Sequence, residues 1–85
     1  MTTTTKSLPA PMAGTIAYRN AAQQPRFRPS VKLAMALQHN DEGFCTVCGN
    51  AVEGIEPDAH NDVCPHCGSP NVYGIEQLAL MGLVR

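Results

Sequence analysis

The sequence contains Cys45-Thr46-Val47-Cys48-Gly49 and then, after a gap, Cys64-Pro65-His66-Cys67-Gly68. Each stretch is a Cys-x2-Cys pair followed by glycine, and fifteen residues separate the second cysteine from the third. One such pair places two sulfur atoms on a tight turn, and two facing turns supply four soft ligands at about 2.3 Å from a metal ion. The spacing therefore predicts a metal site formed by four residues, Cys45, Cys48, Cys64 and Cys67.

The four thiolates limit the chemistry that this site can perform. A catalytic zinc ion keeps a coordination position open for water, and four protein ligands close that position. We therefore expect one structural zinc ion and a non-enzymatic protein. Because thiolates also bind iron, a single iron that carries one electron is the alternative. Thiol exchange is a third reading, although neither cysteine pair opens a helix within a βαβ unit as thioredoxin-like chemistry requires.

The two Cys-Gly turns resemble the paired knuckles of zinc ribbons and rubredoxin-like domains over residues 44–73. The segments Val52-Glu-Gly-Ile-Glu-Pro-Asp-Ala59 and Val72-Tyr-Gly-Ile-Glu-Gln-Leu78 also resemble small bacterial and phage zinc-ribbon proteins of unassigned function. The resemblance implies a ribbon fold and, on the rubredoxin side, bound iron. Rubredoxins have a dense aromatic core, whereas this region offers only Phe44 and Tyr73, which favours zinc.

The size of the chain also favours a structural metal. It has 85 residues, of which 5% are aromatic and none is tryptophan. A chain this short buries little apolar surface, and a bound metal is a common source of its missing stability. We expect a small metal-stabilised α+β fold.

The chain divides into two parts at residue 30. Residues 1–29 contain Pro9, Pro11, Pro25 and Pro29, and their hydrophobic residues do not recur with the period of a strand or of a helix. This composition predicts an extended basic tail. Residues 30–85 form the predicted zinc-ribbon domain, with a metal core of two short β-hairpins at 44–73.

One short helix is expected on each side of this core. Residues 31–39 are rich in helix-forming residues and follow Ser30, a suitable N-cap. Residues 75–83 form the predicted closing helix, whose end Gly82 weakens.

Charge is distributed unevenly along the chain. Residues 1–40 carry five basic residues and no acid, whereas residues 41–85 carry one base against seven acids, a net charge of −6. A basic arm with an aromatic residue suits nucleic acid, through phosphate contacts and base stacking, although the acidic metal domain opposes a polyanion. The candidate residues for this alternative are Arg19, Arg26, Phe27, Arg28 and Lys32.

Two weaker features have ordinary explanations. Glu53, Glu56, Asp58 and Asp62 lie between the cysteine pairs and could form a hard-ion site, but a solvated acidic loop is favoured. His60 and His66 are alternative metal ligands only if one cysteine is not used, because a structural zinc takes four ligands.

The apolar final segment, residues 75–84, indicates a surface that binds another protein. Leu80, Leu83 and Val84 point in directions that a single packing face of the predicted helix does not use. We therefore predict an adaptor that binds a protein partner or forms a homo-oligomer, without a small-molecule substrate. The first residues lack a signal-peptide pattern and residues 78–84 are too few to span a membrane, so we expect a cytoplasmic protein.

Overall fold

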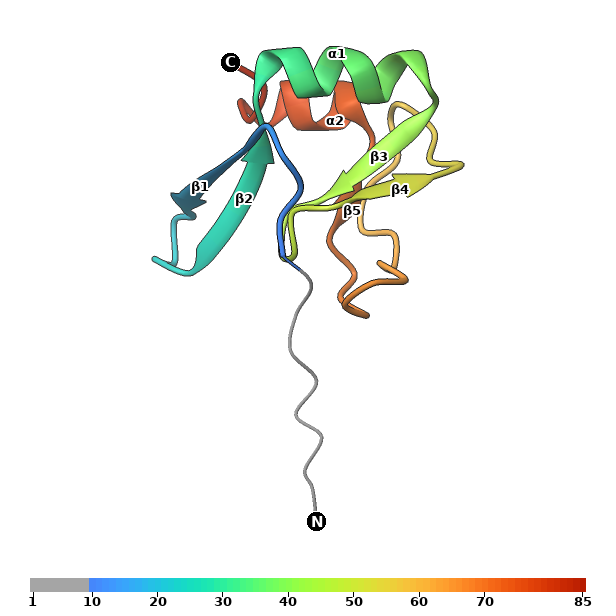
Figure 1. Cartoon of the computed structure of the whole chain (residues 1–85). Helices are drawn as coiled ribbons and strands as arrows, with labels where there is room; N and C mark the ends of the chain where they lie inside the picture. Colours follow the sequence, from blue (N-terminus) through green and yellow to red (C-terminus); the bar gives the residue numbers. More distant parts are fainter. Residues whose placement is uncertain (1–9) are drawn as a thin grey trace.

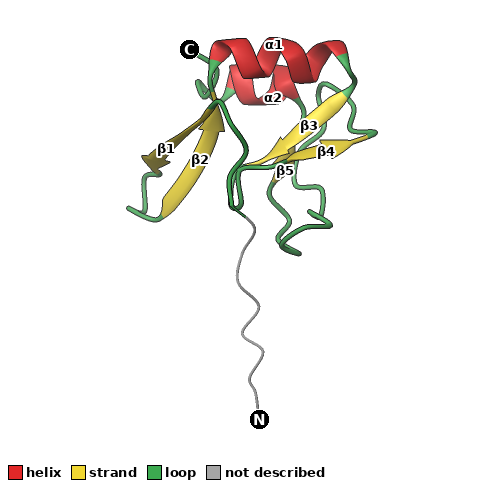
Figure 2. Ribbon diagram, in the orientation of Figure 1, coloured by secondary structure: helices red, strands yellow, loops and turns green. Residues whose placement is uncertain are grey.

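The computed structural model describes residues 10–85, which form a small α+β fold with two small sheets and two helices (Figure 1). The first sheet is a hairpin of two strands, and the second has three antiparallel strands in the order β4-β3-β5. The two helices lie next to each other at one end of the molecule (Figure 2). The elements are β1 (Thr15–Arg19), β2 (Pro25–Pro29), α1 (Val31–His39), β3 (Glu42–Cys45), β4 (Ala51–Glu53), β5 (Val72–Tyr73) and α2 (Ile75–Leu80).

The prediction of an extended tail is wrong for residues 15–29, which form the β1–β2 hairpin. Its register runs from Thr15 opposite Pro29 to Arg19 opposite Pro25. Proline is tolerated in a strand where its missing N–H would point away from the neighbouring strand. Both prolines meet this condition. Arg26 and Arg28 form the hydrogen bonds to β1, and every second residue of β2, including Pro25 and Pro29, points its main-chain groups away from β1. Residues 1–9, the rest of the predicted tail, lie outside the described part of the chain.

The structure confirms the first helix as predicted. α1 spans Val31–His39, and the hydroxyl oxygen of Ser30 accepts a hydrogen bond of 3.2 Å from the main-chain N–H of Leu33. This bond satisfies one of the N–H groups that have no partner within the helix.

The second helix is shorter than predicted, because α2 ends at Leu80 and not at residue 83. Gly82 adopts a positive φ of 78°, and its N–H donates to the carbonyl oxygen of Ala79 at 3.0 Å. The N–H of Leu83 reaches back to the carbonyl oxygen of Leu78 at 2.9 Å. These paired bonds form a Schellman motif, which ends the helix and turns the chain away.

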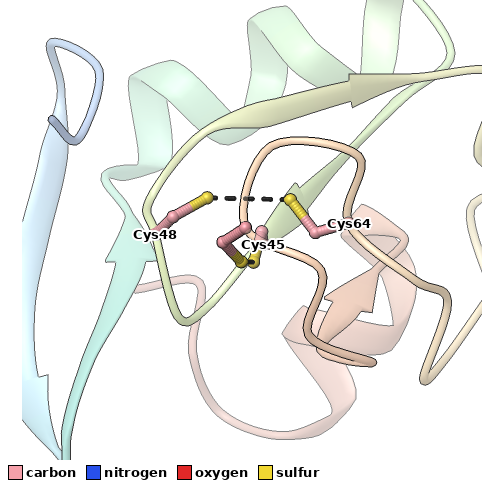
Figure 3. Close-up of side chains that lie close together, drawn as sticks. Cys45, Cys48 and Cys64 are labelled. Carbon is pink, nitrogen blue, oxygen red and sulfur yellow. Dashed lines mark hydrogen bonds between the residues drawn. The ribbon is translucent and has the colours of Figure 1, made fainter. Parts of the chain in front are cut away.

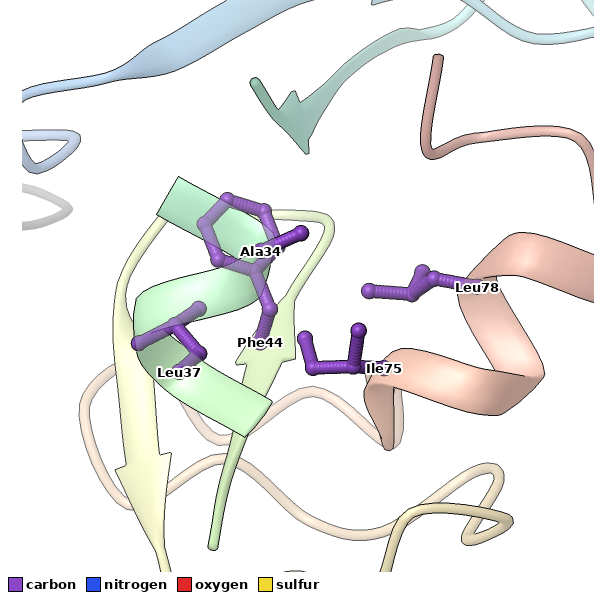
Figure 4. Packing of buried hydrophobic residues seen from close by; sticks show 5 residues of the cluster. All are labelled: Ala34, Leu37, Phe44, Ile75 and Leu78. Atoms are coloured by element: carbon purple, nitrogen blue, oxygen red, sulfur yellow. The ribbon is translucent and has the colours of Figure 1, made fainter. Parts of the chain in front are cut away.

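The core consists of two clusters that meet at β3. Phe44 is fully buried under the helices, whereas the neighbouring Cys45 faces the second cluster, which contains the cysteines, since successive side chains of a strand point to opposite sides. Figure 4 shows the first cluster, in which side chains of α1 and α2 surround the Phe44 ring. Its buried members are Ala34, Leu37, Phe44, Ile75 and Leu78.

Candidate metal centre

The two Cys-Gly turns have the same main-chain geometry. In the first turn the N–H of Gly49 donates to the carbonyl oxygen of Cys45 at 2.9 Å, and in the second the N–H of Gly68 donates to that of Cys64 at 2.7 Å. Both glycines have a positive φ, 75° for Gly49 and 79° for Gly68. Glycine adopts this conformation without steric cost, which explains why each cysteine pair is followed by glycine.

The turns bring four sulfur atoms together. The Sγ atoms of Cys45 and Cys67 are 3.6 Å apart, and those of Cys48 and Cys64 are 3.7 Å apart. All four Sγ atoms lie within 4.8 Å of one another. Figure 3 shows the side chains of Cys45, Cys48 and Cys64 converging between the two turns.

These distances fit a tetrahedral metal ion. Four sulfurs at about 2.3 Å from a central ion are about 3.8 Å from each other, close to the separations of the two closest pairs. A disulfide would need a separation of about 2.05 Å, and all four cysteines are free thiols. The group formed by Cys45, Cys48, Cys64 and Cys67 could therefore hold a metal ion, as the spacing predicts.

Burial controls the protonation of two of these thiols. Burial raises the pKa of Cys45, while hydrogen bonds from the main-chain N–H groups of Cys48 and Val47 act to lower it. The pKa of Cys48 is raised strongly, first by burial and then by the negative charge that Cys45 carries once it has lost its own proton. Both groups keep their protons at neutral pH in the metal-free protein, so a metal ion must displace these protons when it binds.

Cys67 differs because it is partly exposed and has a polar neighbour. Burial acts to raise its pKa, but hydrogen bonds from the hydroxyl and main-chain N–H of Ser69 outweigh it, and the pKa falls to about 7. The Oγ atom of Ser69 lies 3.4 Å from the sulfur of Cys67 and 3.8 Å from that of Cys45. Ser69 therefore supports two ligands. Sequence reasoning missed it, although its place just after the second Cys-Gly turn is a usable signal.

His66 contributes its main chain to the site. Its N–H donates to the sulfur of Cys64 at 3.3 Å, which stabilises a thiolate there. Its exposed ring lies with Nε2 3.2 Å from the carbonyl oxygen of Ala51. Within residues 10–85, neither His66 nor His60 belongs to the group of side chains placed to share a metal ion.

The residues around the sulfur atoms are aliphatic. Val52 and Val72 are buried in the cysteine cluster, and Val47 and Ile55 pack against it while partly buried. These side chains limit the access of water to the ligands.

The acidic residues between the cysteine pairs are solvated. The side chains concerned are Glu53, Glu56, Asp58 and Asp62, and all four are exposed. In the described part of the chain they form no group placed for metal binding.

The residues of the nucleic-acid alternative do not form one exposed surface. Arg19 and Lys32 are exposed, while Arg26 and Arg28 are half-buried on β2. The partly buried Phe27 packs against the core cluster, which conflicts with its expected role in base stacking.

The predicted partner-binding residues are also divided. Leu80 is 82% exposed at the end of α2. Leu83 and Val84 follow the helix end and pack partly against the core cluster. Only Leu80 of these three therefore presents most of its side chain to a partner.

No helix within residues 10–85 has the length and apolar character needed to cross a membrane. Comparisons with family models, curated proteins and solved structures give no match to this chain. The geometry of the four cysteines is therefore the main guide to function.

Proposed function

We propose that this protein is a non-enzymatic zinc-ribbon adaptor, in which a structural zinc ion holds the fold and the surface binds a protein partner. The observation that carries the proposal is the set of four thiols with all Sγ atoms within 4.8 Å of one another. When bound to four thiolates, zinc supplies a redox-inert cross-link without an open position for substrate.

The surroundings of the sulfur atoms favour zinc over iron. The hydrophobic side chains that pack with the cysteines are valine and isoleucine, and Phe44 is directed into the other cluster. The dense aromatic shell of a rubredoxin-like iron site is therefore missing from the described cysteine cluster. Four free thiols also suit a reducing compartment such as the cytoplasm, in which thiols are kept available for metal.

A structural role agrees with the size of the core. The helical cluster contains five buried side chains, one of which is the small Ala34. The second cluster is built around the cysteines themselves, so its packing depends on their being held together. Metal binding can supply the missing folding free energy in a domain of this kind.

Metal analysis of the purified protein tests the metal assignment. We expect about one zinc per chain, no visible absorption, and loss of the metal in Cys48→Ser. A red protein with one iron per chain would instead support the electron-transfer alternative.

Partner capture tests the adaptor assignment. The zinc-loaded protein should retain a specific protein from a lysate of its own source, while Cys48→Ser should not. If the zinc-loaded protein captures nothing and turns over a substrate, the adaptor proposal is wrong.

A further inference from the structure

Within residues 10–85, the hairpin presents one edge whose main-chain groups have no partner. The N–H of Phe27 donates to the carbonyl oxygen of Thr46 at 2.7 Å, so the main chain of Phe27 points away from β1. Phe27 lies opposite Ala17 in the antiparallel register. In such a pair both residues direct their N–H and C=O groups outward. The outer edge of β1 therefore carries the N–H and C=O groups of Thr15, Ala17 and Arg19.

The other edge of the hairpin is already closed. Pro25 and Pro29 occupy the outward-pointing positions of β2 and have no N–H to offer, while that of Phe27 is used. On β1, by contrast, Ala17 and Arg19 are exposed. No main-chain hydrogen bond from outside the hairpin ends on Thr15, Ala17 or Arg19 anywhere in residues 10–85.

The charge around this edge is positive, because the hairpin of residues 15–29 carries three arginines and no acid. The guanidinium group of Arg19 donates to the carbonyl oxygen of Gln23, and that of Arg28 donates to the main-chain oxygen of Arg85. The guanidinium of Arg26 donates to the carbonyl oxygen of Pro25 and the amide oxygen of Gln24. In the described part of the chain, none of these bonds ends on a carboxylate side chain.

This charge also indicates which strand the edge accepts. If β1 paired with β1 of a second copy, two hairpins that each carry three arginines and no acid would lie side by side, and their net positive charges would repel. An acidic strand would place carboxylates opposite Arg19, the arginine of β1 itself, while Arg26 and Arg28 on β2 add positive charge from one strand further away. The edge of β1 is therefore complementary to an acidic partner.

We propose that the outer edge of β1 binds an extended acidic peptide segment of a partner protein by adding it to the hairpin as a third strand. Main-chain hydrogen bonds to Thr15, Ala17 and Arg19 provide the attachment, and the arginines select acidic side chains. This inference rests on the proposed function and names the surface and the kind of partner.

A titration of the isotope-labelled, zinc-loaded protein followed by NMR tests the inference. The probe is a synthetic peptide that alternates glutamate and valine, and the matched control alternates lysine and valine. We expect the glutamate peptide to shift the amide signals of Thr15, Ala17 and Arg19 and to slow their hydrogen exchange. The lysine peptide should leave these signals unchanged.

A pair of substitutions at Ala17 separates main-chain pairing from attraction by charge. Ala17→Pro removes an outward N–H that the hairpin does not use, whereas Ala17→Val keeps it. Losing the one hydrogen bond that this N–H donates should weaken binding of the glutamate peptide about tenfold in Ala17→Pro, with little change in Ala17→Val. Unchanged signals from α1 and β3 would show that each variant remains folded.

Several results would overturn the inference. The inference is wrong if the glutamate peptide leaves the three amides unchanged, or if Ala17→Pro and Ala17→Val bind it equally well. It is also wrong if these amides shift when the protein alone is concentrated, which indicates pairing between two copies. A parallel titration with single-stranded oligothymidylate tests nucleic-acid binding, and the inference is wrong if only this oligonucleotide shifts the amides. If the peptide fails while the zinc-loaded protein still captures a partner, the adaptor proposal stands and only this surface is wrong.

Discussion

Gly49 and Gly68 occupy equivalent places in the two cysteine turns, yet of the two only Gly49 is covered by other parts of residues 10–85. Both have a positive φ and both donate to the carbonyl oxygen of the first cysteine of their turn. A methyl group on Gly49 would lie 2.7 Å from the Cβ of Pro11 and 3.2 Å from the ring of Phe27, whereas one on Gly68 would meet no atom within 4 Å. The first turn is therefore packed against the hairpin, and the second is open.

Substituting each glycine with alanine should reveal this difference. Gly68→Ala introduces only the backbone cost of a positive φ, about 1 kcal/mol. Gly49→Ala adds steric overlap of about 1–3 kcal/mol. Denaturant unfolding of the zinc-loaded proteins measures both free energies. Equal losses in the two variants would mean that the hairpin does not press on the first turn.

Removing the metal should unfold the protein. Structural zinc contributes apparent binding free energies on the order of 10 kcal/mol in small domains, which exceeds what this core can supply alone. We expect a strong chelator to abolish the thermal transition in circular dichroism and to make the chain sensitive to protease, with recovery on adding zinc. A chelated protein that melts at the same temperature as the untreated one would contradict a structural role for the metal.

Metal affinity should fall as the pH falls. An ordinary cysteine thiol has a pKa of about 8.5, and burial raises the pKa values of Cys45 and Cys48 further where the site is folded, so both thiols hold protons in the metal-free chain and release them on binding. Release of at least these two protons lowers the apparent affinity about a hundredfold for each unit of decreasing pH. Competition with a chelator of known affinity between about pH 7 and pH 6 measures the slope. An affinity that does not change over this range would mean that the sulfur atoms are not the ligands.

The N-cap of α1 should contribute measurably to stability. Ser30→Ala removes the hydroxyl that accepts from the N–H of Leu33, and we expect a loss of about 1 kcal/mol in the free energy of unfolding. Ser30→Asp keeps an acceptor at the same place and serves as the control. If both variants lose the same free energy, the hydrogen bond is not the cause.

The four-cysteine group was predictable because its evidence is local. In the two Cys-x2-Cys-Gly stretches the cysteines identify the candidate ligands and the glycine indicates the positive φ of each turn, so the sequence alone reveals both features. The same holds for α1, whose cap and helix-forming residues are adjacent in the chain.

The hairpin was not predictable from its composition, because what matters is the register of its prolines. Pro25 and Pro29 are compatible with β2 only because both fall at positions that do not bond to β1. That register depends on contacts between segments distant in sequence, such as the bond from Phe27 to Thr46. The contact of Ser69 with Cys45, unlike its local contact with Cys67, likewise depends on how the second turn folds back.

The alternation of Phe44 and Cys45 along β3 joins the two clusters through a single peptide bond. A disturbance at the sulfur atoms therefore reaches the ring beneath the helices without any intermediate element. We expect the protein to be degraded faster in cells that lack zinc, because loss of the ion would expose Phe44 to solvent and make the chain a substrate for proteases.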